Sequence, residues 1–309
     1  MVDAPPSPWS LGPALPGPQL EPGVAALGQR VVVAGGFYQN QQQGLGITRD
    51  VVAFDQFEGT WTAYAEAPVE WTHANLAGAT GTLYLLGGAE GTDFIARGDA
   101  YALDIDVPSA TWRPLAPMPP GRERSASGVV VGPSSIYLIG GASTTGAVAS
   151  VLAYNISMDT WSELPPLPAP RSHPAVMRTA DGTLIAAGGL ATLESSSARG
   201  EVWALPLGAT EWEPRAPMLT ARGGCAYGTV FTQLICAGGE AGSSALRSVE
   251  RYDELIDQWT ALDDMPAARA GTQAAVIGDR LYVPGGAEQL RFEPTDTLFV
   301  FSYLDAIAD

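Results

Sequence analysis

The sequence predicts an all-β fold, a six-bladed β-propeller with four strands in each blade, and three observations support this prediction. A short apolar run that ends in a pair of glycines recurs six times along the chain. A tryptophan follows each of the first five runs. The tryptophan that the last run lacks stands at the other end of the chain, at Trp9. Regular repeats of this kind are typical of folds in which each unit buries its apolar face against its neighbours.

The glycine pairs mark a buried strand in every repeat. They lie 47 to 53 residues apart and end at Gly36, Gly88, Gly141, Gly189, Gly239 and Gly286. The four apolar residues before each pair, as in VVVAGG or LYLLGG, favour a strand that is buried on both faces. Glycine then lets the backbone leave the strand through φ and ψ values that a Cβ atom disfavours.

Two more signals keep fixed places in the repeats. A large side chain lies on the strand after each polar loop, and these residues are Phe54, Leu103, Tyr154, Leu205, Tyr252 and Phe301. The tryptophan comes next, at Trp61, Trp112, Trp161, Trp212 and Trp259. A proline-rich turn and one further strand lead to the next glycine pair, so each repeat holds four strands.

This order of Gly-Gly, a large residue and Trp resembles the kelch repeat over nearly the whole chain. The chain looks like a bacterial-type kelch protein, with a more distant resemblance to propellers of the sialic-acid mutarotase and galactose-oxidase kinds. The resemblance implies a single six-bladed kelch propeller domain over residues 1–309. Leu103 and Leu205 depart from the family pattern, because an aromatic residue is usual at their positions.

The N-terminal segment is predicted to close the ring. Trp9 precedes a proline-rich turn and then strand-like residues that lead into the first glycine pair, which is the order seen between successive repeats. The strand around Trp9 should therefore be the outer strand of the sixth blade, next to the C-terminal strands. Closure of this kind removes an open sheet edge.

Charge and hydropathy exclude several classes of function. The net charge of −17 and the pI of about 4.4 oppose binding to nucleic acids and anionic membranes. All sixteen basic residues are arginines, which excludes lysine Schiff-base and P-loop chemistry. No apolar run is long enough to span a membrane, and the first residues lack the basic and apolar regions of a secretory signal. We expect a monomer, either cytoplasmic or secreted after removal of a leader.

The two cysteines lie on neighbouring predicted strands. The turn between Cys225 and Cys236 sets a register that leaves them two positions out of alignment. That offset corresponds to a separation of about 7–8 Å, which is long for a disulfide. Two buried thiols are therefore favoured over a bridge, which stays open as the alternative.

Counting from each tryptophan predicts a ring of candidate ligand-binding residues. Ten residues after the tryptophans lie Trp71, Arg122, Arg171, Arg222 and Arg269, with Gln19 after Trp9. Twelve residues after them lie His73, Arg124, His173, Gly224 and Gly271, with Glu21 after Trp9. These positions open the innermost strand of each blade, and an offset of two places both sets on the same face of a strand. They should therefore surround one mouth of the central channel.

Five arginines, two histidines and a tryptophan at one mouth favour a recognition site over a catalytic one. Guanidinium groups suit carboxylate, sulfate and phosphate groups, so the predicted partner is a protein segment or an anionic small ligand. Trp71 offers a surface for stacking. The alternative for the arginines is structural, as donors to the backbone of a neighbouring blade.

The histidines and a nearby carboxylate leave other interpretations open. A metal site is not favoured, because no third ligand beside His73 and His173 is evident and the arginines would repel a cation. No cofactor is expected. Glu21 beside the arginines would suit an acid or base, as resemblance to sialic-acid mutarotases implies. The alternative function is therefore a carbohydrate-active enzyme, such as a mutarotase-like epimerase, although no nucleophile-elbow, dinucleotide or HExxH motif is present.

Overall fold

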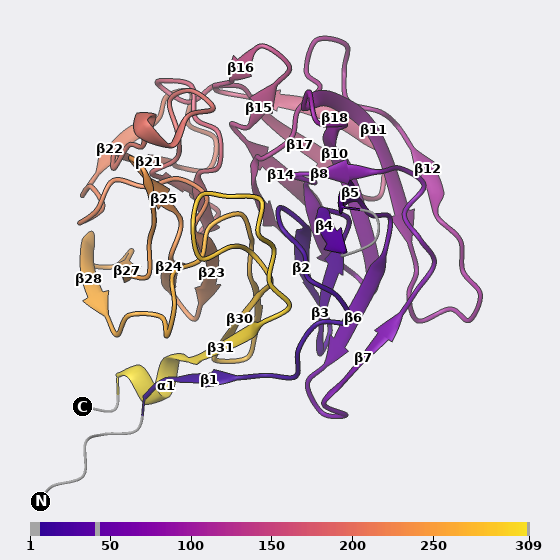
Figure 1. Ribbon diagram of the computed structural model, residues 1–309. Helices are drawn as coiled ribbons and strands as arrows, with labels where there is room; N and C mark the ends of the chain where they lie inside the picture. Colours follow the sequence, from indigo (N-terminus) through magenta and orange to yellow (C-terminus); the bar gives the residue numbers. More distant parts are fainter. Residues whose placement is uncertain (1–6, 41–43, 308–309) are drawn as a thin grey trace, which may run out of the picture.

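The protein is a closed ring of six β-sheets around a central channel (Figure 1), which confirms the predicted six-bladed propeller. The computed structural model describes residues 7–40 and 44–307. Each blade has four antiparallel strands, named here from the channel outward. Blades 1 to 3 are β2 (Gly23–Leu27), β3 (Arg30–Ala34), β6 (Val51–Asp55) and β7 (Thr60–Ala63); β9 (Leu76–Ala79), β10 (Thr82–Glu90), β11 (Ile95–Leu103) and β12 (Arg113–Leu115); and β13 (Gly128–Val131), β14 (Ser135–Ile139), β17 (Val151–Asn155) and β18 (Thr160–Leu164).

The other three blades repeat this arrangement. They are β19 (Ala175–Arg178), β20 (Leu184–Ala187), β21 (Val202–Leu205) and β22 (Glu213–Arg215); β23 (Ala226–Val230), β24 (Gln233–Ala237), β27 (Val249–Asp253) and β28 (Gln258–Leu262); and β29 (Ala275–Ile277), β30 (Arg280–Pro284), β31 (Leu298–Ser302) and β1 (Trp9–Leu11). The two middle strands of each blade carry most of the buried apolar side chains, which pack against the adjacent blades.

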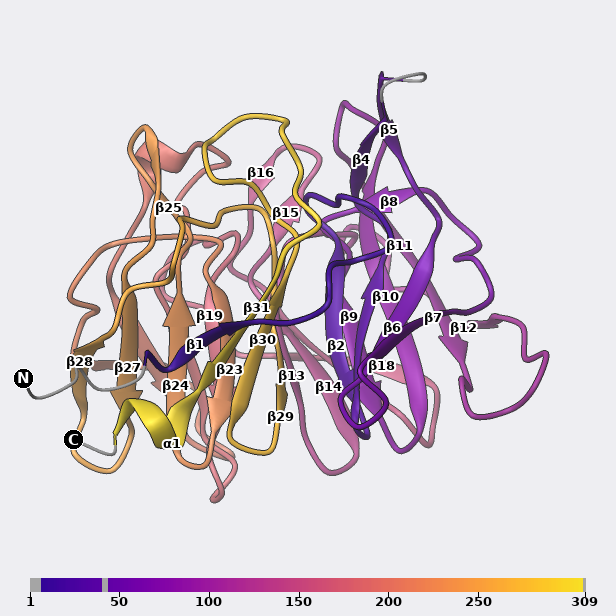
Figure 2. The same ribbon diagram turned by 60° about the horizontal axis from the view of Figure 1, so that its bottom comes forward.

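The shorter elements lie in the loops, with one exception. They are β4 (Phe37–Asn40), β5 (Gly44–Ile47), β8 (Trp71–Thr72), β15 (Ala142–Ser143), β16 (Gly146–Ala147), β25 (Glu240–Ala241), β26 (Ser244–Ala245), the 3₁₀ turn η1 (Ser195–Ser197) and the helix α1 (Tyr303–Ala306). The exception is β8, which pairs with the end of β10 and adds a short fifth strand to the sheet of blade 2. Figure 2 shows β4, β5, β15, β16 and β25 on one face of the ring, which we call the loop face. In the described part of the chain, no helix is long and apolar enough to cross a membrane.

The N-terminal strand closes the sixth blade, as predicted. In Figure 1, β1 runs beside β31, next to α1, and its register pairs Trp9 with Phe301 and Leu11 with Phe299. The indole of Trp9 is 7% exposed and lies 4.9 Å, centroid to centroid, from the ring of Phe301. Residues from the two ends of the sequence therefore share one small core.

The repeated tryptophans tie the outer strands of adjacent blades together. Each indole N–H donates to a backbone carbonyl of the preceding blade, over 2.8 to 3.0 Å. The acceptors of Trp9, Trp61, Trp112, Trp161, Trp212 and Trp259 are Asp263, Pro13, Ala65, Ala116, Pro165 and Ala216. Because Pro13 follows β1, these six hydrogen bonds form a circuit that is complete only when the N-terminal segment is in place.

The glycine pairs are needed because adjacent blades approach closely there. The first glycine of each pair has a positive φ, and a Cβ atom on it would lie 2.3 to 2.7 Å from a carbonyl oxygen of the next blade. At Gly140, for example, the Cβ would lie 2.3 Å from the carbonyl oxygen of Arg171. In five of the six pairs, the second glycine donates its N–H to that same carbonyl. Any larger residue would push the blades apart.

The prediction of two free thiols is wrong, because Cys225 and Cys236 form a disulfide with a Cα–Cα distance of 5.6 Å. The predicted register itself is correct, since Tyr227 rather than Cys225 pairs with Cys236. Cys225, however, lies outside the ladder, directly after Gly224 with its φ of 60°. The separation expected within a flat ladder does not apply at this turn.

Deletion of residues 1–15 should abolish cooperative unfolding. The deletion removes β1, exposes the edge of β31 and breaks two of the six indole hydrogen bonds.

Replacement of Trp9 alone by alanine should lower the free energy of unfolding by about 3–5 kcal/mol. Thermal and urea unfolding followed by circular dichroism measure both effects. Leu11→Ala, at an exposed position of the same strand, is the control and should leave stability nearly unchanged. A truncated chain that melts like the full one would contradict the closure.

Candidate functional site

Six residues at the start of the inner strands form a ring around the mouth of the channel on the loop face. One comes from each blade, and all six have a positive φ, between 49° and 65°. They are Glu21, His73, Ala126, His173, Gly224 and Gly271. Five hydrogen bonds of 2.7 to 3.0 Å link them, each from the N–H of one residue to the carbonyl of its equivalent in the preceding blade. We call this set the mouth ring.

The mouth ring corrects the predicted alignment in blade 3. Two extra residues separate Trp112 from the inner strand there, so Ala126 and not Arg124 occupies the ring position. Arg124 is instead equivalent to Arg171, Arg222 and Arg269, each of which lies two residues before the ring position of its blade. Arg122 lies on the surface, where its Nε donates to Glu163 over 2.9 Å.

The four arginines that precede the mouth ring are buried within their own blades. Arg124, Arg222 and Arg269 are each 1% exposed and Arg171 is 4% exposed. One guanidinium nitrogen of Arg124 donates to the carbonyls of Gly140 and Ser150. Burial, followed by repulsion from Arg122, lowers the pKa of Arg124 to about 10. Arg124 is thus a donor to backbone carbonyls, as the structural alternative for the arginines expected. The carbonyls belong to its own blade, however, and not to a neighbouring one.

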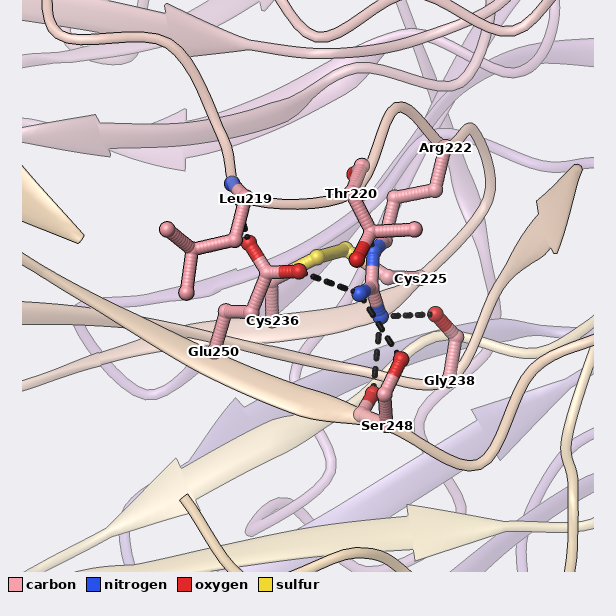
Figure 3. Close-up of polar contacts among 8 residues, drawn as sticks. All are labelled: Leu219, Thr220, Arg222, Cys225, Cys236, Gly238, Ser248 and Glu250. Atoms are coloured by element: carbon pink, nitrogen blue, oxygen red, sulfur yellow. Dashed lines mark hydrogen bonds and ion pairs between the residues drawn. A yellow bond between two sulfur atoms is a disulfide. The ribbon is translucent and has the colours of Figure 1, made fainter. Parts of the chain in front are cut away.

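Arg222 has the most complete set of partners (Figure 3). Its guanidinium donates to the carbonyls of Gly238 and Ser248 and forms an ion pair of 2.5 Å with Glu250. The second carboxylate oxygen of Glu250 accepts the N–H of Leu219. Both charged side chains are almost completely buried, at 0% and 2% exposure. The pair therefore joins β27 to the segment that leads into the mouth ring.

Aromatic rings cover two of the other arginines. The guanidinium of Arg171 lies 4.6 Å from the ring centre of Trp203, and that of Arg269 lies 4.4 Å from Phe299. Trp71 takes the equivalent place in blade 2, where it is 3% exposed and packs against Tyr101. The structure thus places Trp71 and four of the five predicted arginines in the blades and Arg122 on the surface. Of the predicted set, His73 and His173 lie in the channel. Ligand binding by the buried residues stays a prediction.

The mouth itself is a cavity of about 210 Å³ with a largely apolar wall. Three phenylalanines form a contiguous cluster there, with the ring centres of Phe94 and Phe292 at 6.0 and 5.2 Å from that of Phe37. Phe37 is buried, whereas Phe292 is 51% exposed at the rim. The ring of His73 lies 5.4 Å from that of Phe94 and joins this wall to the channel floor.

The floor of the channel mouth carries three polar side chains of the mouth ring, of which Glu21 and His73 line this cavity. His73 Nε2 lies 3.4 Å from a carboxylate oxygen of Glu21, and the rings of His73 and His173 are 5.3 Å apart. Burial lowers the pKa of each histidine to about 4, so both are neutral near pH 7. Burial also raises the pKa of Glu21, an effect that His173 partly offsets.

Glu240 adds a second carboxylate to the wall of the same cavity. Burial, with repulsion from Glu21 and then Glu194, raises its pKa to about 7. Glu240, Phe37 and the other two phenylalanines are not among the residues predicted from the sequence. A signal for Glu240 and Phe37 was available, because each directly follows a glycine pair, as does Ala287 in the wall of the same cavity. Phe94 and Phe292 lie in loops without a fixed spacing.

Comparison with known proteins decides the family. Residues 72–286 match the family model of the KLHDC2/KLHL20/DRC7 Kelch-repeats domain. The chain belongs to the kelch-repeat family. Kelch domains typically bind proteins.

Individual kelch proteins resemble the chain to different extents. Kelch-like protein terF of Aspergillus terreus is 31% identical over 284 residues, which are 87% of this chain and 61% of that protein. Human Kelch-like protein 34 is 27% identical over 257 residues, or 78% of this chain and 38% of that protein. The mouse Influenza virus NS1A-binding protein homolog is 41% identical over 75 residues, 24% of this chain and 12% of that protein. The chain thus spans less than two thirds of the length of each.

Arg222→Ala should destabilise this kelch propeller by about 3–5 kcal/mol, because it leaves the carboxylate of Glu250 buried and unpaired. Urea unfolding measures the change. Arg247→Ala is the matched control, since Arg247 forms an exposed ion pair with Asp264, and the loss there should be at most about 1 kcal/mol. Equal stabilities for the two variants would show that the buried pair does not stabilise blade 5.

Proposed function

We propose that this kelch propeller is a non-catalytic recognition module that binds a segment of a partner protein at the mouth of its channel. The observation that supports this most is the cluster of Phe37, Phe94 and Phe292 around a cavity of about 210 Å³. Aromatic residues in a pocket with a polar floor are typical anchors of protein interfaces. An apolar side chain of the partner would enter between the rings.

An anionic small ligand fits this mouth less well than a protein segment. Four of the five arginines that suggested such a ligand are buried in their blades, and the fifth, Arg122, pairs with Glu163 on the surface. Arg291 is the arginine among the residues that line the cavity. Glu21 and Glu240 contribute carboxylates to the same cavity. The local charge therefore favours a neutral or cationic group on the partner.

One observation favours the alternative of a carbohydrate-active enzyme. Glu240 has a pKa of about 7 and shares the cavity with Glu21 and the neutral His73, so the mouth holds groups suited to donate and accept protons. Glu240→Gln separates the two functions. It would abolish turnover of a sugar, whereas peptide anchoring by the three phenylalanines does not need this proton.

Selection from a phage-displayed library of random peptides tests the recognition proposal. Selected peptides should bind the protein with 1:1 stoichiometry, as measured by titration calorimetry. Phe292→Ala should weaken their binding about tenfold or more, because an aromatic side chain that the partner covers contributes about 1–2 kcal/mol. Phe292 is half exposed, so the variant should keep its fold.

Phe57→Ala is the control for this experiment. Phe57 is 80% exposed and lies in the turn between β6 and β7, away from the mouth. The Phe57→Ala variant should therefore bind the selected peptides as tightly as the original protein. Selected peptides that bind the Phe292 variant as tightly as the original protein would rule out the mouth as the recognition site.

A further inference from the structure

Three nitrogen and oxygen donors meet at the floor of the mouth. They belong to Glu21, His73 and His173, and one donor atom from each lies within 4.8 Å of the other two. The distance of 3.4 Å between His73 Nε2 and the nearer Glu21 oxygen equals the edge of a tetrahedron around an ion with bonds of about 2.0–2.1 Å. The three residues come from blades 1, 2 and 4, so the closed ring brings them together.

Neighbouring hydroxyl groups orient both imidazole rings. Nδ1 of His73 lies 2.9 Å from Thr72 Oγ1, and Nδ1 of His173 lies 3.2 Å from Ser172 Oγ. Ser172 Oγ donates its own proton to the carbonyl of Thr192, so it accepts the proton of His173 Nδ1. The lone pair of that imidazole is therefore on Nε2. Metal-binding histidines commonly have the free ring nitrogen held by such a partner.

There is room for an ion between the donors. A second, deeper cavity of about 30 Å³ is lined by Glu21, His73 and His173 together with Ala126, Gly224 and Gly271. The three small residues of the mouth ring leave this space, because a Cβ atom on Gly271 would lie 2.9 Å from a carboxylate oxygen of Glu21. A space of this size holds one or two water molecules or a coordinated ion.

The charges around the floor suit a cation. Two carboxylates, those of Glu21 and Glu240, face the same small volume. The arginines that would oppose a cation point into their blades instead, where Arg171 and Arg222 form ion pairs with Glu201 and Glu250. Both objections that the sequence raised against a metal are thereby removed, since Glu21 is the missing third donor.

We propose that Glu21, His73 and His173 bind a divalent transition-metal ion of the zinc class at the floor of the channel mouth. Two imidazole nitrogens and one carboxylate are borderline ligands that suit such ions, whereas calcium and magnesium prefer sets made of oxygen alone. Three protein ligands leave at least one coordination position open. That position faces the mouth cavity, where water or a group of a bound molecule completes the coordination. The metal proposal does not depend on peptide recognition.

The proposal is tested by isothermal titration calorimetry, in which tag-free protein that was first treated with a chelator is titrated with Zn²⁺ alone. The expected result is one saturable site per chain. Titration with Co²⁺ should give visible d–d absorption of a nitrogen-ligated ion. Because the chain has only two histidines and both cysteines are disulfide-bonded, this spectrum reports directly on His73 and His173.

His73→Gly and His173→Gly are variants that the fold should accept, because blades 5 and 6 already carry glycine at the equivalent positions. Each should weaken Zn²⁺ binding about 100-fold or more, while its melting temperature without metal stays close to that of the original protein. Glu163→Gln, an exposed carboxylate outside the mouth, should leave binding unchanged. The proposal is overturned if the original protein shows no saturable 1:1 site, or if both glycine variants bind Zn²⁺ as tightly as it does.

Discussion

The blade-to-blade hydrogen bonds of the mouth ring are the constraint on which the rest of this propeller depends. In five of the six ring residues, the N–H reaches the carbonyl of the preceding blade, and each of these residues has a left-handed backbone conformation. That conformation costs a non-glycine residue on the order of 1 kcal/mol. A buried backbone hydrogen bond offsets a cost of this size. The ring thereby fixes the backbone positions of Glu21, His73 and His173, and their side chains extend into the channel.

The outer circuit of indole hydrogen bonds and the glycine pairs support the same geometry from outside. The indoles fix the distance between outer strands, and the glycines allow adjacent blades to approach to carbonyl contact nearer the channel. The arginines that precede the mouth ring stabilise the turns of their own blades, as Arg222 does through Glu250 and Ser248. With its arginines occupied in this way, the mouth presents phenylalanines, neutral histidines and carboxylates. This surface differs in character from the strongly anion-attracting one that the sequence suggested.

The sequence was sufficient for the fold because the fold signals are periodic. Gly-Gly pairs and tryptophans recur at set distances, so the count alone placed Trp9 in the last blade and His73 and His173 in the channel. The role of the arginines was left open between ligand binding and structural support, because one-dimensional spacing does not reveal that a long side chain folds back onto its own blade. Arg124 was aligned with the wrong position for a different reason, because two extra residues separate Trp112 from the inner strand of its blade. Phe94 and Phe292 escaped notice because they lie in loops, where only the folded chain brings them together.

Amide hydrogen exchange at the mouth ring tests this account most directly. The account predicts that the amides of His73, Ala126 and His173 exchange as slowly as that of Leu234 in the central strand β24, and only through global unfolding, because each is a blade-to-blade hydrogen bond. Increasing denaturant should lower the opening free energies of all four amides together. Fast exchange of the ring amides while Leu234 stays protected would contradict the account, since the mouth would then open without loss of the propeller.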